Sequence, residues 1–137
     1  MSKKLILYII AFLLVGNVFA QNRVIKGQIF DENFEPLDFA RIKANENNYV
    51  ADKFGYFEIE IPESVKEIEI HYIAQLSEKF NIENKCYVNV VILRQYIIEF
   101  ESIKEEAKFY KKLRKKTNRK YKKAVKNGIL KKEENCN

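Results

Sequence analysis

The side chains that could carry out covalent chemistry are few in this chain of 137 residues. His71 is the only histidine, and the alternation around it places it on the outer face of a strand. Beyond residue 20 the serines are Ser64, Ser77 and Ser102, and none stands in the strand-to-helix elbow that exposes a hydrolase nucleophile. Because nucleophilic catalysis needs a nucleophile, a base and a group that orients the base, we expect no catalytic residues and no enzymatic activity.

Metal and cofactor chemistry is not predicted either. One histidine and two distant cysteines, Cys86 and Cys136, are too few for zinc, which takes three or four ligands. Asp31 and Asp52 could bind calcium together, but aspartates in turns also accept hydrogen bonds from their own backbone, and we favour that explanation. Since no glycine-rich phosphate-binding loop occurs, we expect no metal and no cofactor.

Three tyrosines raise the question of carbohydrate binding. Tyr49, Tyr56 and Tyr72 could form a platform on which a sugar ring stacks, although tyrosine is also common in strands and at the edges of cores. The chain has no tryptophan, which weakens the case for sugar. A glycan-binding module is therefore the alternative hypothesis.

Basic residues are concentrated in the C-terminal part of the chain. Residues 101–137 contain 14 Lys and Arg against five Glu, whereas residues 21–100 contain nine Lys and Arg against 14 acidic residues. Strong helix formers dominate residues 96–128, and no glycine or proline occurs there before Gly128, which predicts a basic amphipathic helix. The candidate surface-binding residues on it are Lys108, Lys111, Lys112, Arg114, Lys115, Lys116, Arg119, Lys120, Lys122 and Lys123.

A narrow stripe of apolar and small residues runs along the same helix. Its members are Ile103, Ala107, Tyr110, Leu113, Thr117, Tyr121 and Ala124. Three roles stay open: a solvated appendage, an interfacial helix on an anionic membrane, or a helix that docks on the acidic domain or in the groove of a partner protein. Nucleic acid would also suit the charge, but we expect no nucleic acid because export makes that partner scarce.

The first 20 residues have the layout of a secretory signal peptide. Lys3 and Lys4 precede an unbroken apolar run over residues 5–15, and small residues flank Phe19 just before Gln21. The run is too short for a spanning helix, which needs about 20 apolar residues. An uncleaved interfacial anchor is the alternative. We expect a protein that is periplasmic, associated with the outer membrane, or secreted.

Export would place both cysteines in an oxidising compartment. They could form one disulfide, but Cys136 lies in a polar segment, residues 129–137, that we expect to be a disordered tail. Cys86 could equally be a small buried apolar residue. The sequence leaves both possibilities open.

Seven short strands are expected in residues 21–95, without a helix between them, which predicts a mainly β fold of the transthyretin or immunoglobulin-like sandwich type. The expected strands cover residues 24–31, 39–44, 49–51, 56–61, 68–72, 76–82 and 87–93. The predicted core consists of Val24, Ile29, Ala40, Ile42, Phe57, Ile59, Ile61, Ile68, Ile70, Val88, Val90 and Ile92.

Two stretches of this region carry a family pattern. The matching residues are Gly27, Asp31, Pro36, Leu37 and Ala40 in the first stretch, and Asp52, Gly55 and Phe57 in the second. With these residues the chain resembles the carboxypeptidase regulatory-like domain, a transthyretin-like β-sandwich found in exported Bacteroidetes-type proteins and at the front of TonB-dependent receptors. Phe34 and Ala74 stand where that family often has glycine.

The resemblance implies a non-catalytic accessory module. We therefore expect an exported interaction module of the cell envelope, with a basic helix that attaches it to an anionic membrane surface or to an envelope protein.

Overall fold

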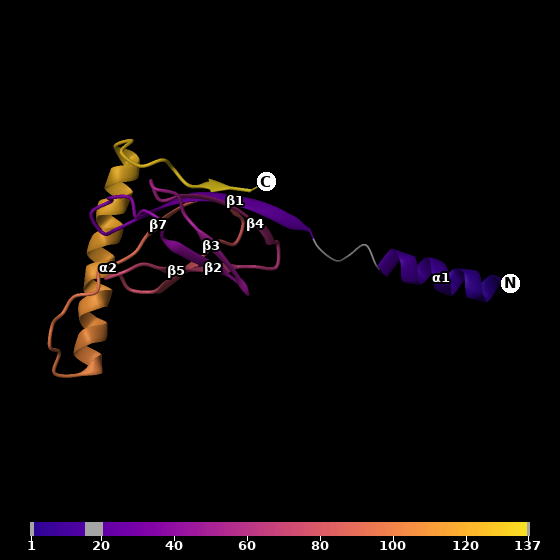
Figure 1. Ribbon diagram of the computed structural model, residues 1–137, viewed down its shortest axis with the longest axis horizontal. Helices are drawn as coiled ribbons and strands as arrows, with labels where there is room; N and C mark the ends of the chain where they lie inside the picture. Colours follow the sequence, from indigo (N-terminus) through magenta and orange to yellow (C-terminus); the bar gives the residue numbers. More distant parts are fainter. Residues whose placement is uncertain (1, 16–20, 137) are drawn as a thin grey trace.

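The computed structural model describes residues 2–15 and 21–136. It is mainly β, with two four-stranded sheets and two helices in the described ranges. Figure 1 shows the helix α1 (Lys3–Val15) apart from the sheets, and the helix α2 (Ile103–Lys126) along one side of them. Residues 21–95, which contain seven of the eight described strands and their loops, are called the two-sheet domain below.

The first sheet has the strand order β4-β1-β7-β8, formed by β4 (Tyr56–Pro62), β1 (Asn22–Phe30), β7 (Lys85–Val91) and β8 (Glu134–Asn135). The strand β1 pairs antiparallel with β4 and parallel with β7, so the two ends of the two-sheet domain meet at the centre of the sheet. As its apolar sequence on both faces predicted, β7 is an interior strand.

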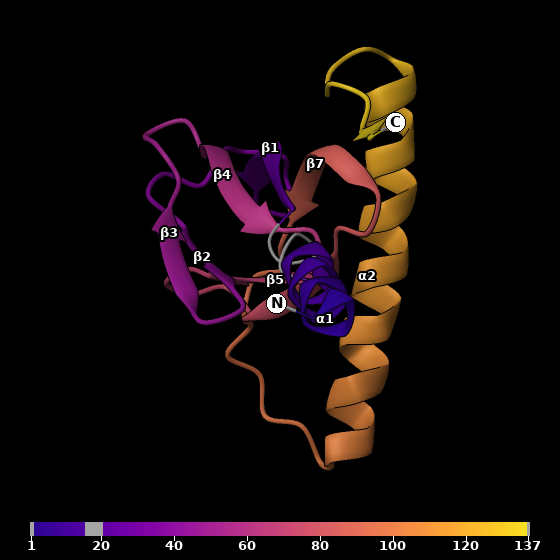
Figure 2. The ribbon, with the colours of Figure 1, turned by 90° about the vertical axis from the view of Figure 1, so that its right-hand side faces the viewer.

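The second sheet has the order β3-β2-β5-β6, formed by β3 (Asn47–Val50), β2 (Arg41–Ala44), β5 (Glu67–His71) and β6 (Glu78–Asn81). All its neighbouring strands are antiparallel. Figure 2 shows this sheet beside the first one, with its edge strand β3 on the left of the view and α2 on the right.

One core joins the two sheets, and strict alternation builds it. In β4 every second residue is buried, which places Phe57, Ile59 and Ile61 inside and two glutamates outside. The buried members of this inner core are Ile25, Ile29, Leu37, Ala40, Ile42, Ala44, Ala51, Phe57, Ile59, Ile61, Val65, Ile68, Ile70, Ile82, Val88, Val90 and Ile92.

The prediction that Val24 belongs to the core is wrong. Val24 is 44% exposed, whereas its neighbour Ile25 is fully buried. Ile25 and Ile29 are four positions apart and therefore lie on the same face of the strand. Because side chains alternate between the two faces, Val24 lies on the opposite face.

The C-terminal segment also differs from the prediction. Residues 129–136 were expected to be loose, but β8 pairs with the start of β7, Leu130 is buried, and Cys136 forms a disulfide with Cys86. The described residues therefore contain eight strands rather than seven. The pairing joins residues 50 positions apart, a contact without a local sequence signal.

The helix α1 covers part of the expected signal peptide, and its described side chains are exposed. The expected cleavage site at residues 18–20 lies outside the described residues. Within residues 2–15 and 21–136, no helix combines the length and the apolar character needed to cross a bilayer.

The helix α2 begins at Ile103 and ends at Lys126, so it is shorter than the expected range of 96–128. A capping residue lies at each end. Ser102 is the N-cap, and its hydroxyl accepts a hydrogen bond from the backbone N–H of Glu105 at 3.2 Å. At the other end Gly128 has φ +74°, and its N–H donates to the carbonyl of Val125 at 3.1 Å. Residues 96–101 form an irregular segment before the cap.

Candidate functional site

The helix α2 is docked on the two-sheet domain through a second apolar cluster. This outer cluster contains Phe30, Val91, Ala124 and Leu130, with Phe34, Tyr121 and Val125 packed against them. Thr117, at 3% exposure, and Ala124, at 5%, form the most buried line of the helix. The middle and end of the predicted apolar stripe therefore face the chain's own sheets, whereas Ile103, at 86% exposure, and Ala107 at its beginning are exposed.

Polar contacts fix the helix in the same position. Arg114 donates from Nη1 to the carbonyl of Val91 at 2.8 Å, and its Nη2 forms an ion pair with the carboxylate of Glu78. Asn89 donates from Nδ2 to the hydroxyl of Tyr121 at 3.2 Å. The docked helix thus bridges β7 of the first sheet and β6 of the second.

An aromatic group holds the beginning of α2 against the segment that precedes it. The rings of Tyr96 and Phe100 both lie against Phe109, with centroids 5.7 and 5.4 Å away. Tyr110 accepts a hydrogen bond from the backbone N–H of Tyr96 at 3.1 Å. A hydrogen bond with Glu32, followed by burial, raises the pKa of Tyr96.

One of the ten candidate surface-binding residues, Arg114, makes its contacts within the chain. Arg114 is engaged with Glu78 and Val91, and the side chains of the ion pair are only 27% and 20% exposed. The structure leaves the other nine on the exposed face of α2: Lys108, Lys111, Lys112, Lys115, Lys116, Arg119, Lys120, Lys122 and Lys123.

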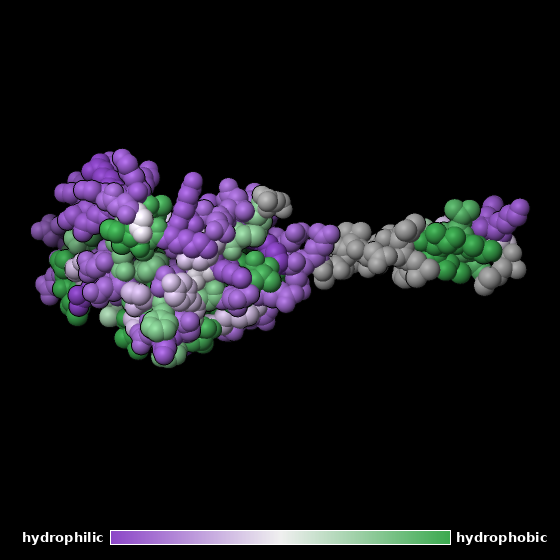
Figure 3. All heavy atoms as spheres, turned by 90° about the horizontal axis from the view of Figure 1, so that it is seen from above, coloured by the Kyte–Doolittle hydropathy of each residue, from purple (hydrophilic) through white to green (hydrophobic). Residues whose placement is uncertain are grey.

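The exposed basic residues of α2 are not neutralised within the chain. Lys126 joins the nine predicted ones, and none of the ten forms an ion pair with any residue in the described ranges. No acidic residue occurs between Glu106 and Glu133. Seen from above, hydrophilic side chains crowd the side of the molecule on which α2 lies (Figure 3). We call these ten residues the basic face.

The two motif aspartates act in turns. Asp31 accepts hydrogen bonds from the backbone of Asn33 and Glu35, at 2.8 and 3.0 Å. Asp52 accepts in the same way from Phe54 and Tyr56, at 2.8 and 2.9 Å. Each carboxylate thus closes its own loop, and among the described residues no group of three potential ligands gathers around a metal position.

The other motif residues hold strands and loops together. A Cβ on Gly27 would meet the ring of Phe57 at 2.6 Å, and one on Gly55, whose φ is +74°, would meet the carbonyl oxygen of Ile29 at 2.6 Å. Leu37 and Ala40 are buried in the inner core, and Pro36 bridges to Phe30. These residues shape the fold and do not form a site.

Two turn residues with side chains, Phe34 and Ala74, have a left-handed backbone. Phe34 has φ 64° and Ala74 has φ 61°. Such values are uncommon for residues with a side chain and cost about 1–2 kcal/mol. The turns therefore have a conformation that suits glycine although glycine is absent.

The structure brings together a histidine, a serine and a glutamate that the sequence analysis did not connect. His71 Nδ1 lies 2.7 Å from the hydroxyl of Ser77, and Nε2 lies 3.2 Å from a carboxylate oxygen of Glu69. Glu69 and His71 are two positions apart in a strand and therefore share a face, and this spacing was the signal in the sequence for their contact. The imidazole side chain is 41% exposed, and Ser77 is exposed on the surface, so this chain of contacts lies open to water.

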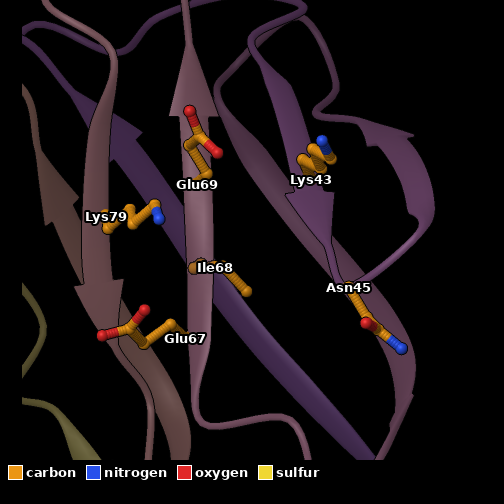
Figure 4. A pocket seen from close by; sticks show the side chains of 6 residues that line it. All are labelled: Lys43, Asn45, Glu67, Ile68, Glu69 and Lys79. Atoms are coloured by element: carbon orange, nitrogen blue, oxygen red, sulfur yellow. The ribbon is translucent and has the colours of Figure 1, made fainter.

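A shallow hollow of about 280 Å³ lies on the same outer face of the second sheet. Figure 4 shows its side chains, with Lys43 on β2, Glu67 and Glu69 on β5, and Lys79 on β6. Glu69 is the cross-strand neighbour of both lysines. Opposite charges alternate across these strands and offset one another, which gives the sheet a polar surface without a dominant charge.

The three tyrosines considered for sugar binding do not form a platform. Tyr49 and Tyr72 pack against the inner core, and their hydroxyls donate to the carbonyl of Glu60 at 3.2 Å and to Asp38 at 2.6 Å. The hydrogen bond with Asp38 raises the pKa of Tyr72. Tyr56 is half exposed and lies on the other sheet.

No family model and no curated protein matches this chain.

Proposed function

We propose that this chain is an exported, non-catalytic module of the cell envelope, in which a β-sandwich of the carboxypeptidase regulatory-like type carries a docked helix that attaches it to an anionic surface. One observation carries the proposal. All ten members of the basic face are exposed on one docked helix, and none has an acidic partner among the described residues.

The docking of α2 supports attachment over the role of a solvated tail. A solvated tail needs no fixed geometry, whereas α2 is held by a buried cluster, an ion pair and an aromatic group. A preformed helix presents its charges without a loss of chain entropy on binding, which favours affinity.

Turn geometry supports the family resemblance. Phe34 and Ala74 adopt positive φ where the family often has glycine, and Asp31 and Asp52 close turns at the motif positions. The module in that family is an accessory domain, which agrees with the open, water-exposed setting of His71 and Ser77.

The helix α1, which begins with Lys3 and Lys4 and is apolar from Leu5 onward, supports export, and the disulfide between Cys86 and Cys136 is compatible with an oxidising compartment.

Co-sedimentation with envelope membranes tests the proposal. The purified protein, residues 21–137, should pellet with the membranes at low salt and remain soluble at high salt, because screening weakens attraction between exposed charges. Replacing Lys112, Lys115 and Arg119 by glutamine should abolish the low-salt binding. Binding that is unchanged by high salt and by these substitutions would contradict the proposal.

A further inference from the structure

Six members of the basic face form one straight row. Their positions are Lys108, Lys112, Lys115, Arg119, Lys122 and Lys126, at alternating steps of four and three residues. With 3.6 residues per turn, these steps return to the same side of an α-helix. At 1.5 Å per residue the row is about 27 Å long. All six side chains are exposed.

The row lies opposite the docked side of the helix. Thr117, Tyr121 and Ala124 face the two-sheet domain, where Thr117 and Ala124 are buried and Tyr121 is partly buried. A helix that inserts into a membrane needs a free apolar face. Between residues 108 and 126 the apolar face of α2 packs against the chain's own two-sheet domain. The row is thus the crest of a convex, charged surface.

The chemistry of the row suits diffuse negative charge. Five of its six members are lysine, which acts as a point charge without the planar fork that lets arginine recognise a single phosphate or carboxylate group. A convex row of point charges fits a flat surface that carries many anions better than it fits one defined group.

The rest of the molecule would orient α2 toward such a surface. Residues 21–100 have nine basic and 14 acidic residues, whereas residues 101–137 have 14 basic and five acidic ones. An anionic surface repels the first part and attracts the second, so the charge asymmetry turns the molecule before contact.

Building on the proposed function, we infer that the anionic surface is a lipid bilayer with anionic headgroups, on which α2 lies flat. The row of six contacts the headgroups, nothing from α2 enters the acyl region, and the two-sheet domain is held away from the membrane. Attachment of this kind is electrostatic and reversible.

Vesicle binding tests the inference. The protein should bind vesicles of phosphatidylcholine mixed with phosphatidylglycerol and should not bind vesicles of phosphatidylcholine alone. Each basic residue near an anionic surface changes affinity by about fivefold. The variant Lys112→Gln, Lys115→Gln, Arg119→Gln should therefore bind on the order of a hundredfold more weakly.

A matched control removes the same charge from another face. Arg41→Gln, Lys43→Gln, Lys79→Gln changes three exposed basic residues of the second sheet, and its affinity should stay within a few fold of the unmodified protein. Circular dichroism and thermal melts should show that both variants are folded. Equal weakening of both variants would overturn the role of the row.

Two further readouts separate the inference from the proposed function. A lipid monolayer should show no rise in surface pressure, since nothing inserts; a clear rise would overturn the flat, peripheral pose. If the protein binds envelope membranes and dextran sulfate but not phosphatidylglycerol vesicles, an anionic polysaccharide is the partner and only the lipid inference fails. If it does not bind envelope membranes at all, the proposed function fails.

Discussion

The inner core and the outer cluster are built in different ways. The inner core lies between two sheets and consists of apolar side chains that simple alternation supplies. The outer cluster joins Phe30 and Val91 with Ala124 and Leu130, which come from distant parts of the chain. Around it lie an arginine–glutamate pair, an asparagine–tyrosine hydrogen bond and the tail that the disulfide retains. The domain is thus stabilised by its bulk apolar core, whereas α2 is held by a few contacts that single substitutions can remove.

Removing the disulfide should have the largest effect and should act mainly on the outer cluster. The variant Cys86→Ser, Cys136→Ser opens a loop whose ends are 50 residues apart. Chain-entropy estimates give about 4 kcal/mol of lost unfolding free energy for a loop of this size. Urea denaturation measures the total loss. Hydrogen exchange should increase in α2 and β8 well before it increases in β1 and β5.

Reduction of the unmodified protein with dithiothreitol is the control, because it breaks the same bond without changing the sequence. It should reproduce the exchange pattern of the double serine variant. Equal acceleration of exchange in β5 and α2 would mean that the two regions unfold as one unit, and the distinction between them would fail.

The ion pair between Arg114 and Glu78 should contribute the next largest effect. Both side chains are mostly buried, so removal of either partner leaves a poorly solvated charge and should cost about 2–3 kcal/mol. A double-mutant cycle with Arg114→Gln and Glu78→Gln should give a coupling energy of about 1–2 kcal/mol.

The pair of Lys131 and Glu134 provides a matched control for that cycle. Its side chains are 56% and 59% exposed, and exposed pairs couple by about 0.2–1 kcal/mol. A coupling energy for Arg114 and Glu78 no larger than this would show that the pair does not hold α2 in place.

The inner core could be predicted because its signal is local. A strand that alternates, as around Phe57, Ile59 and Ile61, has one solution that buries the apolar side. The same rule places β7, apolar on both faces, inside its sheet. The one core error, Val24 in place of Ile25, is a shift by a single residue.

The outer cluster could not be predicted in the same way. The pairing of β8 with β7 and the bond between Cys86 and Cys136 depend on chain path, which no local pattern encodes. Arg114 looked like one basic residue among many, and only its contact with Glu78 distinguishes it. The row of six basic residues was readable from their spacing alone, because steps of four and three define one side of any helix.

Glycine substitutions at two of the left-handed positions, Phe34 and Ala74, should separate backbone strain from packing in the outer cluster. Ala74 has φ 61° and is exposed, so Ala74→Gly should stabilise the protein by about 1 kcal/mol. Phe34 has φ 64°, but its ring packs in the outer cluster with its centroid 6.4 Å from that of Tyr121. Phe34→Gly should therefore show no gain or a net loss in thermal melts. An equal gain at both positions would mean that the Phe34 ring contributes nothing.

High pH should loosen the outer cluster by a smaller amount, and Tyr121 is the group to test. Burial raises the pKa of Tyr121 above its ordinary value of 10.0, partly offset by the hydrogen bond from Asn89. The unfolded chain therefore loses this proton at a lower pH than the folded one. Below pH 10 the contribution of Tyr121 to the free energy of unfolding is fully present, and it is lost as the pH rises from there through the folded-state pKa.

The variant Tyr121→Phe lacks the titrating group, so the difference in unfolding free energy between the two proteins should change only above pH 10. Tyrosines that do not interact with Tyr121 cancel in this difference, whereas Tyr87, whose pKa is raised by burial and in part by Tyr121, adds to it only above pH 10. Because the buried side chains of the inner core do not ionise, exchange in β5 should not follow this difference, whereas exchange in α2 should. A difference that is constant from pH 8 to 11 would show that the Tyr121 hydroxyl is as well solvated in the docked helix as in the unfolded chain.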